Sequence, residues 1–218
     1  MTRPDRPQDP PARPPTPAQA MACDEPAFSV PDFAGRDVFD RAPTFDLRHR
    51  LYRLLWQACW LLLARWTPPP AHRWRIALAN LFGARIDPTA ALYPTVRIWY
   101  PRHLTMQARA TLAPGVNCYC VAPVTLGAYA IVSQGAQLCT ATHDVDDPAF
   151  QLLAAPIRLG AHSWVCAEAF VGPGVRLAEG AVLGARGAAF RDLPAWTVSG
   201  GVPARVIRAR RPFSRDQR

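Results

Sequence analysis

The chain has 218 residues, enough for one domain of ordinary size with appendages, and half of its residues are hydrophobic. Its formal net charge is +9, and all 25 basic side chains are arginine. Such a charge suits nucleic acid, an anionic membrane surface or a phosphate-rich ligand. No DNA- or RNA-binding motif accompanies it, which argues against nucleic acid.

The six cysteines show neither a CxxC spacing nor a dense framework, so we expect reduced thiols and no metal site. The polar, proline-rich N-terminus lacks the apolar stretch of a secretion signal. The best apolar run, 54–64, has eleven residues, whereas a membrane span needs about 20. These features predict a cytoplasmic protein.

Residues 1–46 contain ten of the 24 prolines and little periodic apolar pattern, which predicts a disordered arm. Residues 47–66 follow helical spacing, and Thr67 with the three prolines after it ends that helix. A second short helix is expected over 71–82, so that 47–82 forms a helical lead-in.

The first predicted helix is apolar over most of its surface and carries Trp56, Trp60 and Trp66 beside four arginines. Two interpretations stay open for it. It packs against the following domain or a neighbouring subunit, or it lies in the interface of the inner membrane with its tryptophans and arginines at headgroup depth.

From residue 86 onward an aliphatic residue recurs every six positions, with two slips of two residues and one longer interruption. Thirteen of the fourteen positions are Leu, Ile or Val, although these types make up only 41 of the 218 residues. Chance spacing therefore does not explain the series, which is Ile86, Leu92, Ile98, Leu104, Leu112, Cys118, Leu126, Val132, Leu138, Leu159, Val165, Val171, Leu177 and Leu183.

A period of six suits a prism with three flat faces, because six residues supply one short strand and one tight turn. The aliphatic side chain points inward and stacks on its equivalents in neighbouring coils. Small residues four positions later fit the corners, and glycine relieves the turns. We therefore predict a mainly β protein, with a parallel β-helix over 83–207 and an arginine-rich tail over 208–218.

The pattern resembles the hexapeptide-repeat acyltransferases, in particular the group assigned to O-acetylation of colanic acid and other exopolysaccharides. The helical lead-in, the stretch 132–144 and the closing motif 200–205 carry the resemblance; in that motif Arg205 replaces the usual lysine. The resemblance implies a left-handed β-helix, an exception to the right-handed crossover rule. It also implies acetyl-CoA as donor and a homotrimer with active sites between neighbouring prisms.

His143 and Asp144 lie where the repeat breaks. The step from Leu138 to Leu159 is 21 residues, not a multiple of six, so the chain must leave the prism there. Acetyl transfer to a hydroxyl needs a base, and an imidazole has a suitable reference pKa of about 6.5. The family has its catalytic histidine in this Thr-x-Thr-His-Asp setting, so the resemblance implies His143 as base. Asp144 either orients a neighbouring group or begins the loop.

Four residues are expected to bind coenzyme A. The resemblance implies Trp164 at the edge of the groove for the coenzyme A arm. Gly200 and Gly201 offer backbone N–H groups that no side chain screens, and the charge of Arg205 suits phosphates. Asn117 is the candidate for contacting the acceptor, as an asparagine does in the sugar acetyltransferases of this fold.

The sequence thus predicts direct acetyl transfer from acetyl-CoA to a hydroxyl of a sugar or lipid-linked sugar in exopolysaccharide biosynthesis. Two alternatives stay open: another small acceptor, such as serine, an amino sugar or an antibiotic, or a non-enzymatic scaffold at a membrane surface. A zinc carbonic anhydrase on this fold is disfavoured, because the three-histidine site would have to use His103, His143 and His162, which lack the close pair of that enzyme.

Overall fold

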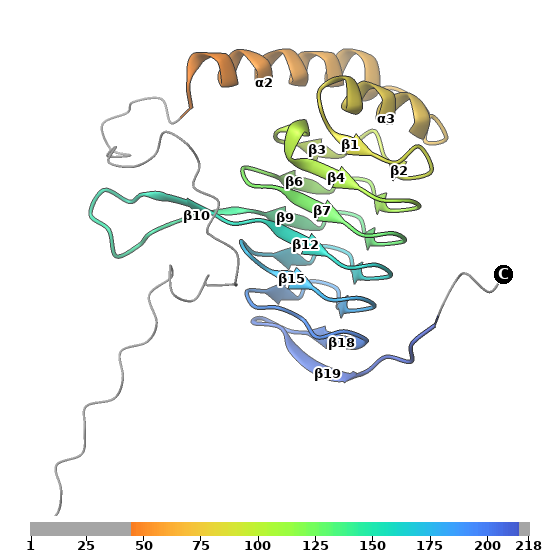
Figure 1. The fold of residues 1–218 in the computed structure, drawn as a ribbon, viewed down its shortest axis with the longest axis vertical. Helices are drawn as coiled ribbons and strands as arrows, with labels where there is room; N and C mark the ends of the chain where they lie inside the picture. The colour runs from red at the N-terminus through yellow and green to blue at the C-terminus, as the bar shows by residue number, and fades with distance from the viewer. Residues whose placement is uncertain (1–44, 214–218) are drawn as a thin grey trace, which may run out of the picture.

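The computed structural model describes residues 45–213 of the chain. The arm predicted for 1–46 lies outside the described residues except for its last two, and the predicted tail is described as far as residue 213. Within the described part, a helical cap is followed by a stack of triangular coils (Figure 1).

Both predicted helices are present. The first, α2 (Leu47–Cys59), begins after Asp46, whose Oδ1 accepts a hydrogen bond from the His49 N–H at 2.8 Å, as an N-cap should. It continues into a π-helical segment, η2 (Trp60–Ala64), before the prolines end it. The second helix, α3 (His72–Leu81), runs back across the same end of the molecule (Figure 1).

The cap is anchored by buried tryptophans and one buried arginine. Trp56 and Trp60 face the first coil, and the Trp56 Nε1–H donates to the Ile98 carbonyl oxygen at 2.8 Å. Arg75 is completely buried and donates to the carbonyl oxygens of Leu92 at 2.6 Å and Pro68 at 2.9 Å. These neutral acceptors satisfy its guanidinium, so Arg75 holds the turn between the helices against the first coil.

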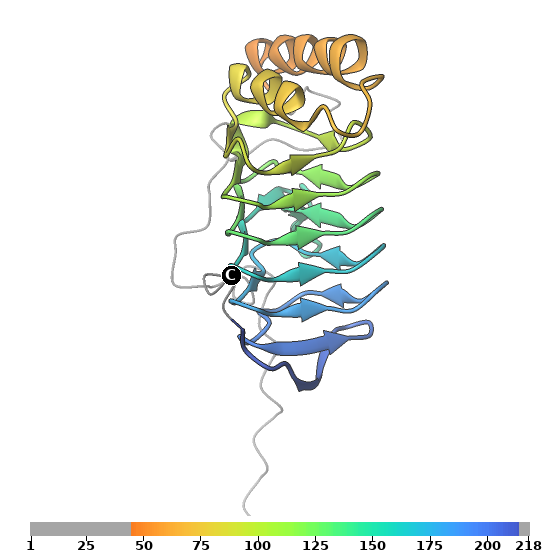
Figure 2. The same cartoon turned by 90° about the vertical axis from the view of Figure 1, so that its right-hand side faces the viewer.

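The remaining chain forms the predicted parallel β-helix, and Figure 2 shows its coils stacked edge to edge. Each coil contributes one short strand to each of three parallel sheets. Sheet A comprises β1 (Arg85–Ile86), β4 (Leu104–Met106), β7 (Val124–Leu126), β12 (Ile157–Leu159) and β15 (Arg176–Leu177). Sheet B comprises β2 (Ala91–Leu92), β5 (Thr111–Leu112), β8 (Ile131–Val132), β13 (Trp164–Val165), β16 (Val182–Leu183) and β18 (Thr197–Gly200), with β19 (Arg205–Ala209) antiparallel at its end. Sheet C comprises β3 (Arg97–Ile98), β6 (Asn117–Tyr119), β9 (Gln137–Cys139), β14 (Phe170–Val171) and β17 (Ala188–Ala189).

All fourteen positions of the six-residue series are buried. In sheet B, Leu92, Leu112 and Val132 stand in register on successive strands, so each aliphatic side chain stacks on its equivalent one coil away. Fully burying one such side chain stabilises a fold by about 1.5–3 kcal/mol, and this repetition explains how two-residue strands hold together.

The interruptions of the series all fall at one corner of the prism, between sheets C and A. Two extra residues lie there between Ile98 and Met106, and two more between Cys118 and Leu126. The longest insertion, between β9 and β12, holds the hairpin of β10 (Ala141–His143) and β11 (Leu152–Ala154). The first insertion includes a short 3-10 turn, η3 (Pro101–His103).

Three of the corner residues expected four positions after an aliphatic are wrong. The corner after β4 holds the buried Ala110, not Ala108, because Met106 rather than Leu104 stands in register with Ile86 and Leu126. Ala122 lies in the insertion before β7 and packs at the hairpin root, and Thr142 lies in the hairpin strand β10. All three errors arise where the chain adds residues before sheet A.

In the described residues no helix combines the length and apolar character needed to cross a membrane. Residues 45–213 also contain no group of three or more His, Cys, Asp or Glu side chains arranged to hold a metal ion.

Candidate functional site

The insertion that carries His143 is a regular hairpin rather than the irregular stretch expected from the spacing. Its strands β10 and β11 pair antiparallel, with His143 opposite Leu152, and it projects sideways from the prism (Figure 1). Sequence periodicity indicates only that the chain leaves the prism here. Strand pairing adds a rigid support for the side chain at the end of β10.

The ring of His143 is held in one tautomer by a contact that the sequence does not reveal. Its Nδ1 lies 2.8 Å from the Phe150 carbonyl oxygen, and the two rings stack with centroids 4.5 Å apart and an angle of 10°. A carbonyl oxygen only accepts hydrogen bonds, so Nδ1 carries the proton. In the neutral imidazole, Nε2 is then left with a free lone pair.

The hairpin is locked to the prism at its base by Thr140, which precedes β10. The buried Thr140 hydroxyl donates to the Tyr119 carbonyl oxygen at 2.9 Å and accepts from the Ala122 N–H at 2.9 Å. Ala141 and Ala154 pack beside Ala122 in a small apolar cluster at the same place. The first threonine of the Thr-x-Thr-His-Asp motif is therefore structural, and it sets where His143 emerges.

Asp144 begins the hairpin loop. Its Oδ1 accepts a hydrogen bond from the Asp146 N–H at 3.1 Å, which closes a local turn. The partner of His143 Nδ1 is the backbone of Phe150 rather than this carboxylate. Of the two roles considered for Asp144, this geometry corresponds to loop initiation.

A groove runs along the outer face of sheet C toward the root of the hairpin. A pocket of about 370 Å³ lies between the α2–η2 helix and strands β3 and β6, and an adjoining pocket of about 320 Å³ shares four lining residues with it. The shared residues are Arg65, Thr95, Arg97 and Asn117. Asn117 is therefore part of the groove wall, and the two arginines make the groove basic.

Aromatic side chains line the larger pocket. Trp60 and Trp99 each bury an Nε1–H that has no hydrogen-bond partner among the described residues. Tyr119 lines the same pocket and also packs against the cluster at the hairpin root. Burial raises the pKa of the Tyr119 phenol, so it stays a neutral hydroxyl.

The residues predicted to bind coenzyme A lie on another face. Trp164 stands on the outer side of sheet B, 43% exposed, next to Ile131 on the neighbouring strand, and its Nε1–H donates to Ser133 Oγ at 2.8 Å. Gly200 and Gly201 lie at the end of β18, and Arg205 begins β19. The exposed Arg205 guanidinium donates to the Ala204 carbonyl oxygen, at 3.0 Å.

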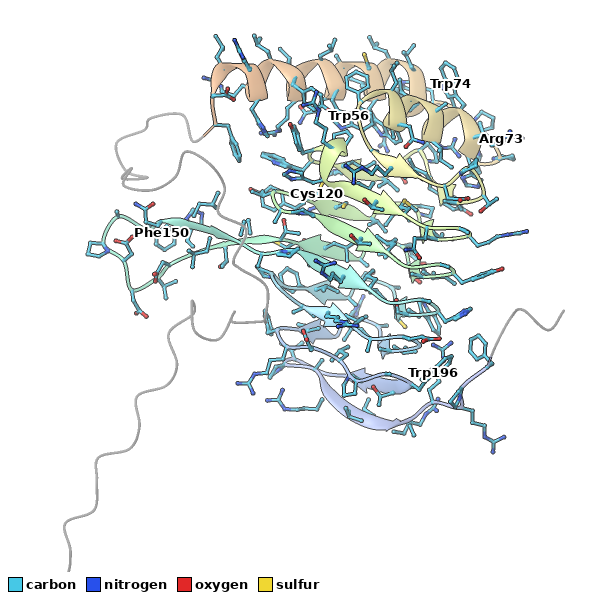
Figure 3. The ribbon with its side chains drawn as sticks, viewed as in Figure 1. Trp56, Arg73, Trp74, Cys120, Phe150 and Trp196 are labelled. Atoms are coloured by element: carbon cyan, nitrogen blue, oxygen red, sulfur yellow. The ribbon has the colours of Figure 1, made fainter. Side chains whose placement is uncertain are left out.

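One chain does not bring these two groups of residues together. His143 leaves the prism at the corner between sheets C and A, whereas Trp164 lies on sheet B, the face opposite that corner. In Figure 3 the hairpin residue Phe150 and Trp196, which leads into β18 of sheet B, lie on opposite sides of the prism. Asn117 and the groove of sheet C, by contrast, adjoin the hairpin root.

In sequence and in fold, the chain is similar to known acetyltransferases. The chain is 40% identical over 156 residues to the protein assigned as colanic acid biosynthesis acetyltransferase WcaF of Escherichia coli (strain K12), covering 72% of this chain and 86% of that protein. It is 33% identical over 142 residues to nodulation protein L of Rhizobium meliloti (strain 1021), covering 62% and 75%.

The fold agrees with a solved structure as well. The crystal structure of a hexapeptide-repeat acetyltransferase of Vibrio cholerae in complex with acetyl-CoA matches with a TM-score of 0.69 and 21% identity, over 78% of this chain and 93% of that one. The chain matches no protein-family model.

The comparisons show the class of protein: the fold is the left-handed parallel β-helix of hexapeptide-repeat enzymes, as the resemblance implied, and the activity is that of an acetyltransferase. The chain belongs to the hexapeptide-repeat acyltransferase family, in the group of the colanic acid biosynthesis acetyltransferases.

Proposed function

We propose that this acetyltransferase moves the acetyl group of acetyl-CoA to a hydroxyl of a sugar or lipid-linked sugar during exopolysaccharide assembly, with His143 as general base. The observation that carries the proposal is the His143 tautomer, because a proton on Nδ1 leaves Nε2 ready to accept one. The relatives support a sugar acceptor through their names, and the proposed location is the cytoplasm, at the inner membrane.

In the proposed reaction, Nε2 of His143 takes the proton of the acceptor hydroxyl as its oxygen attacks the thioester carbonyl carbon. A carbon–oxygen bond forms and the carbon–sulfur bond breaks. The imidazolium then returns the proton to the departing sulfur, so no covalent enzyme intermediate and no metal are needed. Phe150 is a positioning residue, because its carbonyl and ring hold the imidazole.

The residues of sheet B suit acetyl-CoA in their chemistry. The exposed Trp164 and Ile131 give an apolar strip for the pantetheine arm, and Ser133 holds the indole in place. Arg205 supplies positive charge for the phosphates at the end of the strip. Gly200 and Gly201 complete the proposed site with backbone N–H groups; Gly201 is exposed, whereas the Ile207 side chain lies beside Gly200.

The groove on sheet C suits a sugar acceptor. Sugars bind by stacking on aromatic rings and by hydrogen bonds to polar side chains, and this groove combines Trp99 and Tyr119 with Asn117 and two arginines. The arginines also favour an acceptor that carries phosphate, as nucleotide-linked and diphosphate lipid-linked sugars do.

The proposed assembly is a homotrimer, and the separation of the two half-sites supports an arrangement in which neighbouring subunits share each site. Since His143 and Trp164 lie on opposite sides of one prism, a complete site needs the hairpin of one subunit beside sheet B of the next. Three prisms arranged around an axis form three such sites. The proposed trimer thus explains why the catalytic and coenzyme-binding candidates are separated in one chain.

The test is acetyl-CoA-dependent thiol release with a panel of sugar and lipid-linked sugar acceptors. We expect wild type to release thiol only with acceptor, and His143→Ala to lose on the order of 10² or more of that rate. Phe150→Ala should lose a smaller factor, because it removes the stacked ring but keeps the backbone carbonyl. Val145→Ala, in the same loop and 69% exposed, serves as the matched control and should keep the wild-type rate.

If His143→Ala transfers acetyl as fast as wild type while acetyl-CoA binding is intact, His143 is not the base. If wild type does not bind acetyl-CoA at all, the scaffold alternative takes precedence. The preferred acceptor in the panel separates polysaccharide precursors from serine, amino sugars or antibiotics.

A further inference from the structure

The apolar side of helix α2 faces away from the protein. Seven leucines of α2 and η2 are between 48% and 73% exposed, namely Leu47, Leu51, Leu54, Leu55, Leu61, Leu62 and Leu63. The side that faces the first coil instead carries Tyr52, Arg53 and Trp56; Trp56 is labelled in Figure 3. A surface helix normally buries its apolar stripe, but within residues 45–213 nothing covers this one.

The exposed leucines form one continuous face. At about 100° per residue, positions 47, 51, 54, 55 and 58 fall within an arc of roughly 100° on the outer side of α2. Arg48 and Arg50, both exposed, lie on the two flanks of that arc. An apolar arc between cationic flanks is the pattern of helices that lie in a lipid headgroup region.

The neighbouring elements extend this face. Trp66, directly after the π-helical segment, is 80% exposed, and Trp74 on α3 is 51% exposed, with its Nε1–H donating to the Leu63 carbonyl oxygen at 2.8 Å. Trp side chains at the edge of an apolar surface suit the boundary between acyl chains and headgroups. Both helices lie across the same end of the prism in Figures 1 and 2.

The positive charge of the cap indicates which kind of surface it binds. Between residues 47 and 86 the sequence has seven arginines and no Asp or Glu. Such a segment is repelled by basic proteins and attracted to anionic lipid headgroups. We propose that the cap, comprising α2, η2, Trp66 and α3, docks in the interfacial region of an anionic bilayer, with the prism axis along the membrane normal.

Membrane docking of the cap also bears on the acceptor, and for this one point it rests on the proposed function, in which the acceptor is a lipid-linked sugar. Leu61 and Arg65 belong to the docking segment and also line the groove on sheet C. The groove therefore opens within about one helix diameter, roughly 10 Å, of the headgroups. A sugar joined to a membrane lipid through diphosphate reaches Arg65 and Arg97 without leaving the bilayer. Side-by-side packing of three prisms uses their lateral faces and leaves the cap free.

The test is flotation of the full-length protein with vesicles, without acetyl-CoA or acceptor, so that its outcome is separate from that of the thiol-release assay. One set of vesicles is phosphatidylcholine, and in the other phosphatidylglycerol replaces about a third of it. We expect wild type to bind the anionic vesicles at least tenfold more strongly, and binding to weaken as salt rises from about 50 to about 500 mM.

Two pairs of substitutions separate the apolar and electrostatic contributions. Leu54→Gln with Leu62→Gln should lower binding to anionic vesicles on the order of tenfold or more. Arg48→Gln with Arg50→Gln should reduce the preference for anionic vesicles and the salt dependence. Phe190→Gln, at the far end of the prism and 56% exposed, is the matched control and should bind like wild type. All of these side chains are exposed, so the fold tolerates their replacement.

The proposal is overturned if wild type does not float with anionic vesicles, or if the leucine variant binds them as well as wild type does. It is also overturned if the leucine substitutions change the oligomeric state in lipid-free solution, measured by light scattering, and vesicle binding is unaffected. The cap would then be an interface between copies of the chain.

Discussion

The corners of the prism hold ordinary side chains in left-handed backbone. Seven non-glycine residues of the described part of the chain have positive φ, and six of them lie at these corners, namely Arg109, Tyr129, His162, Glu168, Arg186 and Trp196. Such a conformation costs about 1–2 kcal/mol per residue. Stacking offsets part of that cost, because corner residues of adjacent coils hydrogen-bond and pack: the Tyr129 and His162 rings lie 5.2 Å apart at 11°.

Glycine is required at one corner for a different reason, which gives a testable prediction. A Cβ on Gly180 would lie 2.4 Å from the Trp196 ring, whereas on Gly115 the nearest atom would be at 3.6 Å; both have positive φ, +66° and +74°. We expect Gly180→Ala to destabilise by about 2–5 kcal/mol, from left-handed strain plus overpacking. Gly115→Ala should cost about 1 kcal/mol, from strain alone.

Urea unfolding of the two variants measures this difference. Equal losses of stability would mean that the Trp196 ring moves aside at little cost, and that backbone strain alone accounts for both effects. The comparison is well matched because each glycine lies at the same kind of turn, and each substitution adds one methyl group.

At the residue scale, the sequence points to His143 as the candidate base but does not reveal what orients its ring. The Thr-x-Thr-His-Asp motif and the break in the repeat both point to this histidine. Phe150 is missed, because its role depends on a backbone carbonyl and on a hairpin whose pairing no six-residue period encodes. Arg75 is also missed, since a buried arginine that binds only neutral acceptors resembles any surface arginine in sequence.

At the element scale, an aromatic stack joins the start of α2 to the corner between sheets C and A. His49 stacks on Tyr100 at 4.6 Å, and Tyr100 meets His103 edge-on at 4.8 Å. Burial lowers the pKa of both histidines, and the charge of Arg53 lowers that of His49 further, although Asp46 opposes it. The contact between cap and prism therefore favours neutral imidazoles.

This stack predicts that acid loosens the cap. A histidine whose pKa is lower in the folded than in the unfolded state binds fewer protons when folded. The resulting penalty is absent above the unfolded value of about 6.5, grows as the pH falls below it, and is complete below the folded pKa. We expect the melting temperature to fall by a few degrees between about pH 7.5 and about pH 5 for this reason.

His103→Gln tests the assignment, because the amide N–H can replace the imidazole as donor to the Cys120 carbonyl oxygen, now 3.2 Å from Nδ1, without taking up a proton. The variant should lose less stability than wild type over the same pH range. An unchanged loss would show that other groups govern the acid response. Hydrogen exchange of α2 amides at both pH values would show whether the cap is the part that loosens.

The elements themselves were predictable to different degrees. The helical spacing of 47–66 and the six-residue repeat predict the first helix and the coils, because each pattern is the one that gathers the aliphatic residues of its element on one side. The two-residue interruptions of the six-residue period can be read from the sequence. Their common location at one corner of the prism cannot, because the spacing does not show between which two sheets the extra residues lie. The pocket between α2 and sheet C depends on how the helix crosses the prism, which is a tertiary contact beyond any local pattern.

At the scale of the whole molecule, one chain contains two half-sites that face away from each other. The fold class follows from the sequence because the repeat is dense enough to exclude other architectures. The proposed pairing of His143 with Trp164 is implied only by the family resemblance, because no pattern within one chain describes how two prisms meet. A second chain is therefore part of the proposed site, and this arrangement allows a test by complementation.

Two inactive variants should restore one another if sites form between subunits. His143→Ala lacks the base, and the double variant Trp164→Ala, Arg205→Ala lacks the proposed coenzyme site. When the two variants are co-expressed in equal amounts and mix randomly in a trimer, each site takes its base from one subunit and its coenzyme site from the next. Each of these halves is intact in about half of the cases, so roughly one site in four is complete. We expect roughly a quarter of wild-type thiol release, and almost none from separately purified trimers mixed without subunit exchange. If co-expression restores nothing although mixed trimers form, the base and the coenzyme site belong to the same chain, and the hairpin must reach its own sheet B.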